Sequence, residues 1–179
     1  GEAPEPYTVK AITNGAAMRI APVGCLFSTD DLPKLAKFIR GVSEATHKTD
    51  VALGSAGMVA AAVSAAIEDR SWEEIMQIAS RAFDLTAAYG EETYSASPKA
   101  RLQIAIELAH RHAREAEAFS LNLYETIGTT TLASEAVPAA LGMAYYFRDP
   151  ETCSLACANL GGDTDTIGAM AVAICGAKA

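Results

Sequence analysis

Asp163 and Asp165 lie two positions apart at a point where a loop leads into a helix. Gly161 and Gly162 before them allow a tight backbone turn, and an apolar stretch rich in small residues follows. A helix N-terminus needs one side-chain acceptor for its free N–H groups, so the second carboxylate is surplus to capping. Two neighbouring anions repel each other unless a cation or a proton lies between them. Because the polar side chains of this segment all offer oxygen, the pattern favours Mg²⁺, Mn²⁺ or Ca²⁺ over Zn²⁺.

A plainer interpretation of the same residues is an ordinary helix N-cap with a second, solvated carboxylate beside it. Short Asp/Thr strings are frequent at helix starts, so the segment taken alone favours capping. An EF-hand is disfavoured because the glycine and the closing glutamate of its loop are absent. The acidic turn therefore needs support from elsewhere in the chain before it indicates a metal site.

A loop near the start of the chain, residues 13–19 with the sequence Thr-Asn-Gly-Ala-Ala-Met-Arg, contains a second candidate site. The Asn14-Gly15 pair predicts a turn in which positive φ is available, and the small residues let a ligand approach the backbone. Such a loop could present N–H groups to a phosphate, with Arg19 as a fork-shaped donor. The structural alternative is a turn in which Arg19 makes a salt bridge.

His47 stands just before a long alanine-rich segment that we expect to be helical from about residue 51 to residue 68. It could contact a ligand, cap that helix or make a structural hydrogen bond, and the sequence slightly favours the last of these. His110 and His112 are two positions apart on an expected helix, so they project in different directions and cannot share one ion.

The elements around these candidates are predicted to be about seven helices joined by short loops. Ser71 and Glu74 match a capping box that begins one helix. Ser97-Pro98 begins another, in which an apolar stripe extends as far as Ala116. The other expected helices span about residues 32–41, 51–68, 136–147, 150–159 and 164–176. No alternating strand, repeat or low-complexity run is evident, so the predicted fold class is all-α.

Composition limits the class of protein. The chain has 179 residues, of which 50% are hydrophobic, enough for one globular domain or a large part of one. Only 7% are aromatic while alanine is abundant, which favours closely packed helices over a β-sandwich. The formal net charge of −8, without a basic stripe, makes duplex nucleic acid and anionic membranes poor partners. A metal and a few local donors could still bind a small anion.

The expected cellular location is inferred from the lack of evident membrane-spanning and secretion signals in the sequence. No apolar run looks long enough to span a bilayer, and the first residues do not resemble a signal peptide. The four cysteines form no CxxC pair, and the helical spacing of Cys153 and Cys157 indicates buried free thiols. A reducing cytoplasm is the expected compartment.

Three separated stretches, residues 14–22, 46–47 and 137–168, resemble the ADP-ribosylglycohydrolase family in sequence, order and spacing. The motif Leu-Gly-Gly-Asp-Thr-Asp-Thr-Ile-Gly over residues 160–168 is the most specific part. The resemblance implies an orthogonal multi-helix bundle with two divalent cations, Mg²⁺ or Mn²⁺, on the floor of a cleft. It also implies a metal-dependent hydrolase that cleaves the glycosidic bond between ADP-ribose and a protein side chain or a small molecule.

Residue roles follow from positions within the family's motifs. The expected metal ligands are Asp163, Asp165 and Thr166, with Asp165 bridging the two ions and both aspartates catalytic. The expected contacts to the diphosphate, the distal ribose and the rest of the ligand are Asn14, Gly15, Ala16, Met18, Arg19 and His47.

The resemblance covers the C-terminal portion of the family's domain, because the N-terminal acidic motif that supplies further metal ligands is absent. Asp30-Asp31 follows Thr29 but lies after the phosphate loop, so its order excludes it as that motif. Residues 1–179 are therefore expected to form part of one all-helical domain, with the N-terminal half of the same protein as partner. Alone, they are expected to bind metal poorly and to be inactive. Two other functions fit the retained motifs: an inactive ADP-ribose-binding or structural relative, and a hydrolase of a different ribosylated small molecule.

Overall fold

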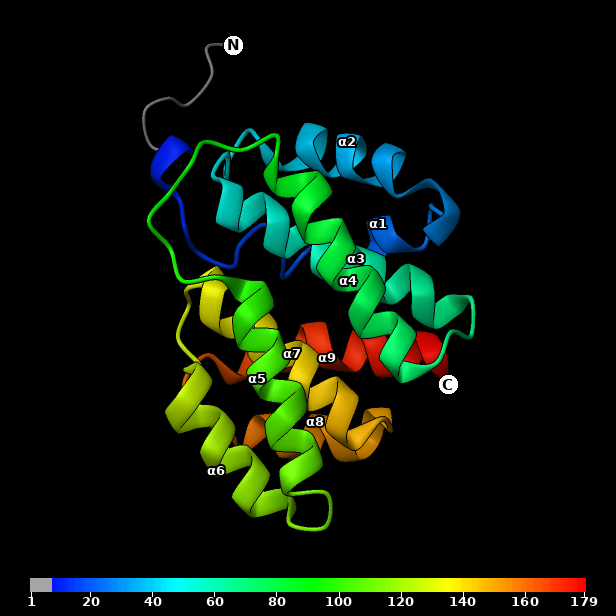
Figure 1. Cartoon of the computed structure of the whole chain (residues 1–179), viewed down its shortest axis with the longest axis vertical. Helices are drawn as coiled ribbons and strands as arrows, with labels where there is room; N and C mark the ends of the chain where they lie inside the picture. The colour runs from blue at the N-terminus through cyan, green and yellow to red at the C-terminus, as the bar shows by residue number, and fades with distance from the viewer. Residues whose placement is uncertain (1–7) are drawn as a thin grey trace.

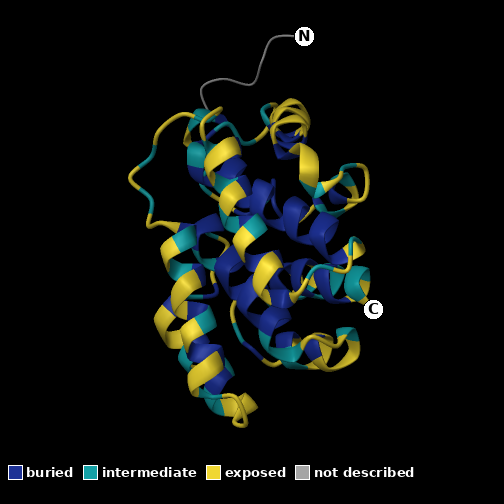
Figure 2. Ribbon diagram, turned by 45° about the vertical axis from the view of Figure 1, so that its right-hand side comes forward, coloured by how far each residue is buried: buried dark blue, intermediate teal, exposed yellow. Residues whose placement is uncertain are grey.

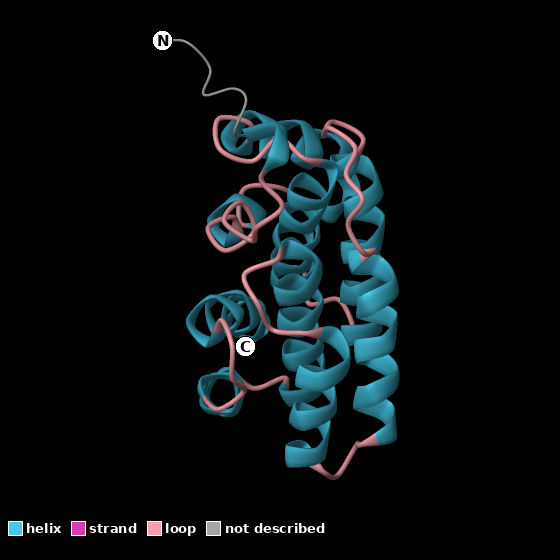
Figure 3. Ribbon diagram, turned by 90° about the vertical axis from the view of Figure 1, so that its left-hand side faces the viewer, coloured by secondary structure: helices cyan, strands magenta, loops and turns pink. Residues whose placement is uncertain are grey.

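The computed structural model describes residues 8–179, and the regular structure in that range is entirely helical (Figure 1). The helices in chain order are η1 (Thr8–Lys10), α1 (Ala21–Gly24), η2 (Thr29–Asp31), α2 (Leu32–Ser43), α3 (Asp50–Ile67), α4 (Trp72–Ala87), α5 (Pro98–Arg111), α6 (Ala116–Ile127), α7 (Ala133–Phe147), α8 (Pro150–Ala158) and α9 (Thr164–Lys178). Figure 3 shows α9, which ends at the C-terminus, nearly end-on beside helices that run vertically, so these helices cross at large angles. The all-α prediction is confirmed.

α3 is the central helix, and it is built almost entirely from small and apolar residues. All its residues from Val51 to Ala66 are buried, and they form part of the dark blue interior of Figure 2. α4, α7 and α9 pack against it, together with α1 and α2. Small side chains let these helices approach closely, since a Cβ atom at Gly57 would collide with Thr86 of α4. Close packing of alanine and glycine thus takes the place of large aromatic side chains in this core.

By length and composition alone, α3 is apolar enough to cross a membrane, which the sequence-based expectation had excluded. Its mean hydropathy is 1.6, but 89% of its 18-residue span is buried inside the protein. The apolar run therefore serves as the core helix of this bundle.

Local capping signals place several helices where the sequence predicts them. The Ser71 hydroxyl accepts a hydrogen bond from Glu74 N–H, and the Glu74 carboxylate accepts one from Ser71 N–H at 2.9 Å. Ser97 and Asp149 cap α5 and α8 with their side-chain oxygens. Gly41 does not end its helix: α2 continues to residue 43, and a Cβ atom at Gly41 would meet nothing within 4 Å.

The single helix expected over residues 98–116 is two helices. α5 ends at Arg111, and α6 begins at Ala116 after a short turn. The carbonyl of His112 in this turn accepts a hydrogen bond at 2.7 Å from the hydroxyl of Tyr146 on α7. A residue distant in sequence therefore fixes the break, and Ala116 is exposed instead of continuing the apolar stripe.

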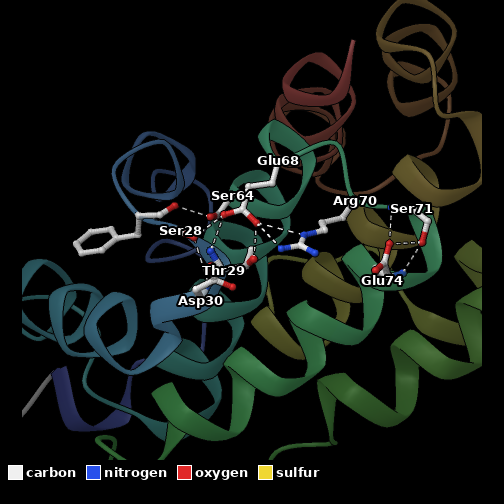
Figure 4. Close-up of polar contacts among 9 residues, drawn as sticks. Ser28, Thr29, Asp30, Ser64, Glu68, Arg70, Ser71 and Glu74 are labelled. Carbon is white, nitrogen blue, oxygen red and sulfur yellow. Dashed lines mark hydrogen bonds and ion pairs between the residues drawn. The ribbon is translucent and has the colours of Figure 1, made fainter.

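The carboxylate of Glu68 ties the end of α3 to the turn that leads into α2 (Figure 4). It accepts hydrogen bonds from the Ser28 hydroxyl and the Thr29 N–H, each at 2.8 Å, and from the Thr29 hydroxyl at 2.5 Å. Arg70 pairs with the same carboxylate at 3.2 Å. Burial alone would raise the pKa of the Glu68 carboxyl, but these hydrogen bonds outweigh it and hold the pKa at about 2.

The four cysteines are free thiols. Cys153 and Cys157 are buried, as their spacing predicts, and so is Cys175, whereas Cys25 is exposed. Hydrogen bonding with Cys157 raises the pKa of the Cys153 thiol to about 12, so this group stays protonated and inert.

Candidate functional site

The loop that contains Asn14 lies against the start of α7. Asn14 N–H donates to the carbonyl of Thr131 at 2.9 Å, and Ala133 N–H donates to the carbonyl of Ile12 at 3.0 Å. Inside the loop, the carbonyl of Asn14 accepts a hydrogen bond from Met18 N–H at 2.9 Å. The turn that the sequence predicts at Asn14 is present and is anchored on both sides.

The acidic turn reaches the same place from the other end of the chain. Gly161 and Gly162 have φ values of +89° and +78°, which L side chains rarely adopt. Asp163 N–H then donates to the carbonyl of Thr129 at 2.8 Å, and a Cβ atom at Gly162 would collide with that carbonyl. The two glycines therefore let the turn press against the residues just before α7, as the predicted tight turn requires.

One hydrogen bond joins the two candidate segments. Nδ2 of Asn14 donates to Oδ2 of Asp163 at 2.6 Å, across 149 positions of sequence, and Asn14 is only 5% exposed. Asp163 occupies the N-cap position of α9, yet its side chain makes no capping hydrogen bond. Its carboxylate binds Asn14 instead, so ordinary capping does not explain Asp163.

Asp165 and Thr166 follow in the first turn of α9. Asp165 is exposed, and within residues 8–179 its side chain has no hydrogen-bond or ion-pair partner, whereas Thr166 is only 9% exposed. Asp165 lies on the wall of a cavity of about 450 Å³ between α8 and α9. An unpaired carboxylate close in sequence to one held by an amide is an arrangement that can accept a cation.

The side chains of the acidic turn are of the chemical type that binds a hard divalent cation, but they are too few to enclose one. Asp163, Asp165 and Thr166 offer oxygen atoms, the donor type that Mg²⁺ and Mn²⁺ prefer. Among the residues that the structure describes, no three His, Cys, Asp or Glu side chains gather closely enough to hold a metal ion.

A second polar cluster surrounds His47 and is joined to the loop by Thr13. The His47 ring nitrogens contact the hydroxyls of Thr13 and Thr46, each at 3.0 Å, and Thr46 accepts a hydrogen bond from Arg19 Nη2 at 2.5 Å. The ring packs on Gly15, where a Cβ atom would lie 2.7 Å from Cε1 of His47. Burial, reinforced by the charge of Arg19, lowers the pKa of His47, so the ring is neutral near pH 7.

The structure shows which polar contacts His47 and Arg19 make within the described residues. Thr49, not His47, caps α3, because its hydroxyl accepts a hydrogen bond from Ala52 N–H at 3.3 Å. The structural hydrogen bonds expected of His47 are present. Arg19 binds the hydroxyl of Thr46, and among residues 8–179 it forms no salt bridge.

The remaining predicted contact residues differ in how they face solvent. Ala16 is fully buried in the core, so only its backbone could reach a ligand, whereas Met18 is 48% exposed. The sequence-based site omitted Thr13 and Thr46, which bracket His47. Each stands next to a predicted site residue in the chain, and that adjacency is the signal that could have identified them.

An apolar groove of about 520 Å³ opens beside the acidic turn, between α6 and α8. Its walls include Leu121, Tyr124, Phe147 and Gly161. A Cβ atom at Gly161 would lie 3.2 Å from the ring of Tyr124, so the turn packs closely under this aromatic side chain. The acidic turn therefore has a polar network on one flank and an apolar groove on another.

Comparisons with known proteins identify one family and two relatives. The family model described as ADP-ribosylglycohydrolase matches residues 1–179. The uncharacterized protein YegU of Escherichia coli is 42% identical over 171 residues, which cover 93% of this chain and 50% of the relative. An uncharacterized protein of Archaeoglobus fulgidus is 29% identical over 166 residues, which cover 93% of this chain and 49% of the relative. The chain thus spans about half the length of the curated relatives it matches.

Proposed function

Because the chain belongs to the ADP-ribosylglycohydrolase family, we propose that it is part of a metal-dependent hydrolase that cleaves the glycosidic bond between ADP-ribose and a protein side chain or a small molecule. The observation that carries the proposal is the hydrogen bond between Asn14 and Asp163. It brings the loop expected to bind phosphate against the turn expected to bind metal, from opposite ends of the chain. A structural turn and an ordinary helix cap would not need this contact.

In this proposal the chain's own residues position a sugar and its phosphates. Asn14 holds one oxygen of the Asp163 carboxylate, which leaves the other oxygen available to a ligand. Arg19, an exposed side chain on the same loop, supplies positive charge for a diphosphate. Asp165 projects from the first turn of α9 without a partner in the described range, so its negative charge is available where an oxocarbenium-like transition state develops.

Divalent cations would be held on this side by Asp163, Asp165 and Thr166, and on the other by ligands from the N-terminal part of the whole protein. When bound, such ions supply Lewis-acid polarisation to the ribose diol and to water.

The test is hydrolysis by the whole protein. Arginine-linked and serine-linked ADP-ribosyl peptides are supplied with Mg²⁺ or Mn²⁺, and free ADP-ribose is measured. We expect turnover by the wild type and a loss of about 100-fold in Asp165→Asn, the size typical of a disturbed metal site. Asp31→Asn is the matched control, because Asp31 is exposed and makes no capping hydrogen bond with its side chain.

Two outcomes would contradict the proposal. Equal rates for the wild type and Asp165→Asn would show that the acidic turn takes no part in catalysis. Tight binding of ADP-ribose without turnover by the wild type would favour an inactive binding relative, the alternative that the incomplete ligand set among the described residues also allows.

A further inference from the structure

Four side chains in and next to the loop that contains Asn14 form one continuous series of hydrogen bonds. Arg19 Nη2 contacts the Thr46 hydroxyl at 2.5 Å, this hydroxyl contacts Nδ1 of His47 at 3.0 Å, and Nε2 of His47 contacts the Thr13 hydroxyl at 3.0 Å. Arg19 begins the series as a guanidinium, which can only donate. Thr13 ends it as an exposed residue next to Asn14. Both ring nitrogens of His47 are therefore occupied by hydroxyls.

The direction of the protons depends on where the single proton of the Thr46 hydroxyl goes. Its oxygen must accept from Arg19, so within the protein the proton can go to His47 or to the carbonyl of Ser43, which lies 3.3 Å away; Thr46 is also exposed to water. That carbonyl already accepts the backbone N–H groups of Thr46 at 3.0 Å and of His47 at 2.8 Å. A carbonyl oxygen has two lone pairs, so both are used. The shorter contact to Nδ1 of His47 is therefore the better place for the proton.

The rest of the series follows from the neutral state of the ring. A neutral imidazole carries one proton, so a ring that accepts at Nδ1 donates from Nε2. Nε2–H then donates to the oxygen of Thr13, and the Thr13 proton is left for a ligand. Every donor in the series points the same way, from the Arg19 charge toward Thr13, and aligned hydrogen bonds of this kind strengthen one another.

We propose that Thr46 is a positioning residue that fixes His47 as the Nε2–H tautomer, and that Thr13 is thereby a hydrogen-bond donor to the bound ligand. Thr13 then selects a ligand group that accepts hydrogen bonds, such as a phosphate or carbonyl oxygen. The identity of the ligand rests on the proposed function, whereas the tautomer of His47 does not.

The tautomer is measured by nitrogen NMR on the whole protein labelled with ¹⁵N-histidine. The His47 signals are assigned as those lost in His47→Asn. We expect Nδ1 to show the shift of an unprotonated ring nitrogen and Nε2 that of a protonated one, in the wild type and in Thr46→Ser. In Thr46→Val, which removes the hydroxyl but keeps the branched shape, we expect a mixture of the two tautomers. A protonated Nδ1 in the wild type would overturn the inference without need of any variant.

The ligand contact is measured by calorimetry with ADP-ribose. We expect Thr13→Val to weaken binding by about tenfold to 100-fold, the usual effect of losing a hydrogen bond to a charged group, and Thr13→Ser to restore it. Unchanged binding by Thr13→Val would overturn the role of Thr13. If the wild type shows the expected tautomer but binds no ADP-ribose, the proposed function and the role of Thr13 both fail, while the role of Thr46 is supported.

Discussion

At the scale of single residues, Asn14 makes the contact on which the candidate site depends. Its amide donates to Asp163 at 2.6 Å, and hydrogen bonds to charged groups contribute about 1.5–3 kcal/mol to stability. Because Asp163 is only partly buried, water can replace part of the lost bond. We therefore expect Asn14→Ala to lower the free energy of unfolding by about 1–2 kcal/mol, measured by urea denaturation.

The matched control is Asn122→Ala. The Asn122 amide donates at 2.9 Å to the carbonyl of Ala118 on the same helix, so it joins no distant segments. A change within about 0.5 kcal/mol is expected for this variant. If the two variants lose the same free energy, the bond between Asn14 and Asp163 contributes no more than an ordinary helix-surface contact.

The same contact shows why the site could be foreseen only in part. The excess of carboxylates at the acidic turn is visible in the sequence, and so is the tight turn at Asn14. The two segments are 149 positions apart, so no local sequence pattern predicts that they pair. Only the resemblance to a family placed them in one site. The proton direction through Thr46 depends on a carbonyl of Ser43 that accepts two backbone N–H groups, which no pattern of residue types reveals.

At the scale of elements, the start of α9 depends on Gly162. Its φ of +78° is unfavourable for other residues, and a Cβ atom there would collide with the backbone of Thr129. We expect Gly162→Ala to lower the free energy of unfolding by about 2–4 kcal/mol, from left-handed strain and the displaced backbone together. Thermal and urea unfolding measure this loss.

Gly41 provides the opposite case within α2. A Cβ atom there meets nothing within 4 Å, and its backbone is helical. Alanine has the higher helix propensity, so Gly41→Ala should raise stability by about 0.5–1 kcal/mol in the same assays. A loss of stability in this variant would mean that α2 uses Gly41 for a contact that the structure does not contain.

The junction between α3 and α2 should respond to pH through Glu68. The pKa of this carboxyl is lowered from 4.5 to about 2 in the folded protein, so its stabilisation is fully present above about pH 4.5 and is lost as the pH falls toward 2. The Glu68 side chain is 24% exposed, so solvent screening reduces the effect to about 1–2 kcal/mol.

The measurement compares the free energy of unfolding of the wild type with that of Glu68→Gln from pH 6 to pH 3. We expect the difference between them to narrow as the pH falls. Glu125→Gln, a change at an exposed residue of α6, is the matched control. A Glu68→Gln difference that does not change with pH would contradict the assigned cause.

The helices themselves were predictable where their signals are local. The capping box of Ser71 and the caps of Ser97 and Asp149 act within one turn, so the sequence identifies them. The break between α5 and α6 is fixed by Tyr146, more than 30 positions away, so the spacing of apolar residues does not predict it. Local chemistry thus predicts where helices begin, and tertiary contacts decide where some of them end.

At the scale of the whole molecule, the core and the candidate site differ in completeness. α3 is enclosed by α1, α2, α4, α7 and α9, and 89% of its apolar span is buried without help from any other chain. Around the expected metal ligands, in contrast, no three His, Cys, Asp or Glu side chains gather among residues 8–179. The buried core indicates that these residues can fold as a unit, and we expect them to hold metal weakly on their own.

This contrast predicts how residues 1–179 behave when they are produced alone. We expect a helical circular dichroism spectrum and a cooperative urea transition, because the central helix is already covered. We expect Mn²⁺ affinity at least about tenfold weaker than that of the whole protein, since further charged ligands raise the affinity of an oxygen site. Electron paramagnetic resonance of free Mn²⁺ during a titration measures both affinities. Equal affinities, with Asp165→Asn abolishing binding in both proteins, would show that these residues contain the complete site.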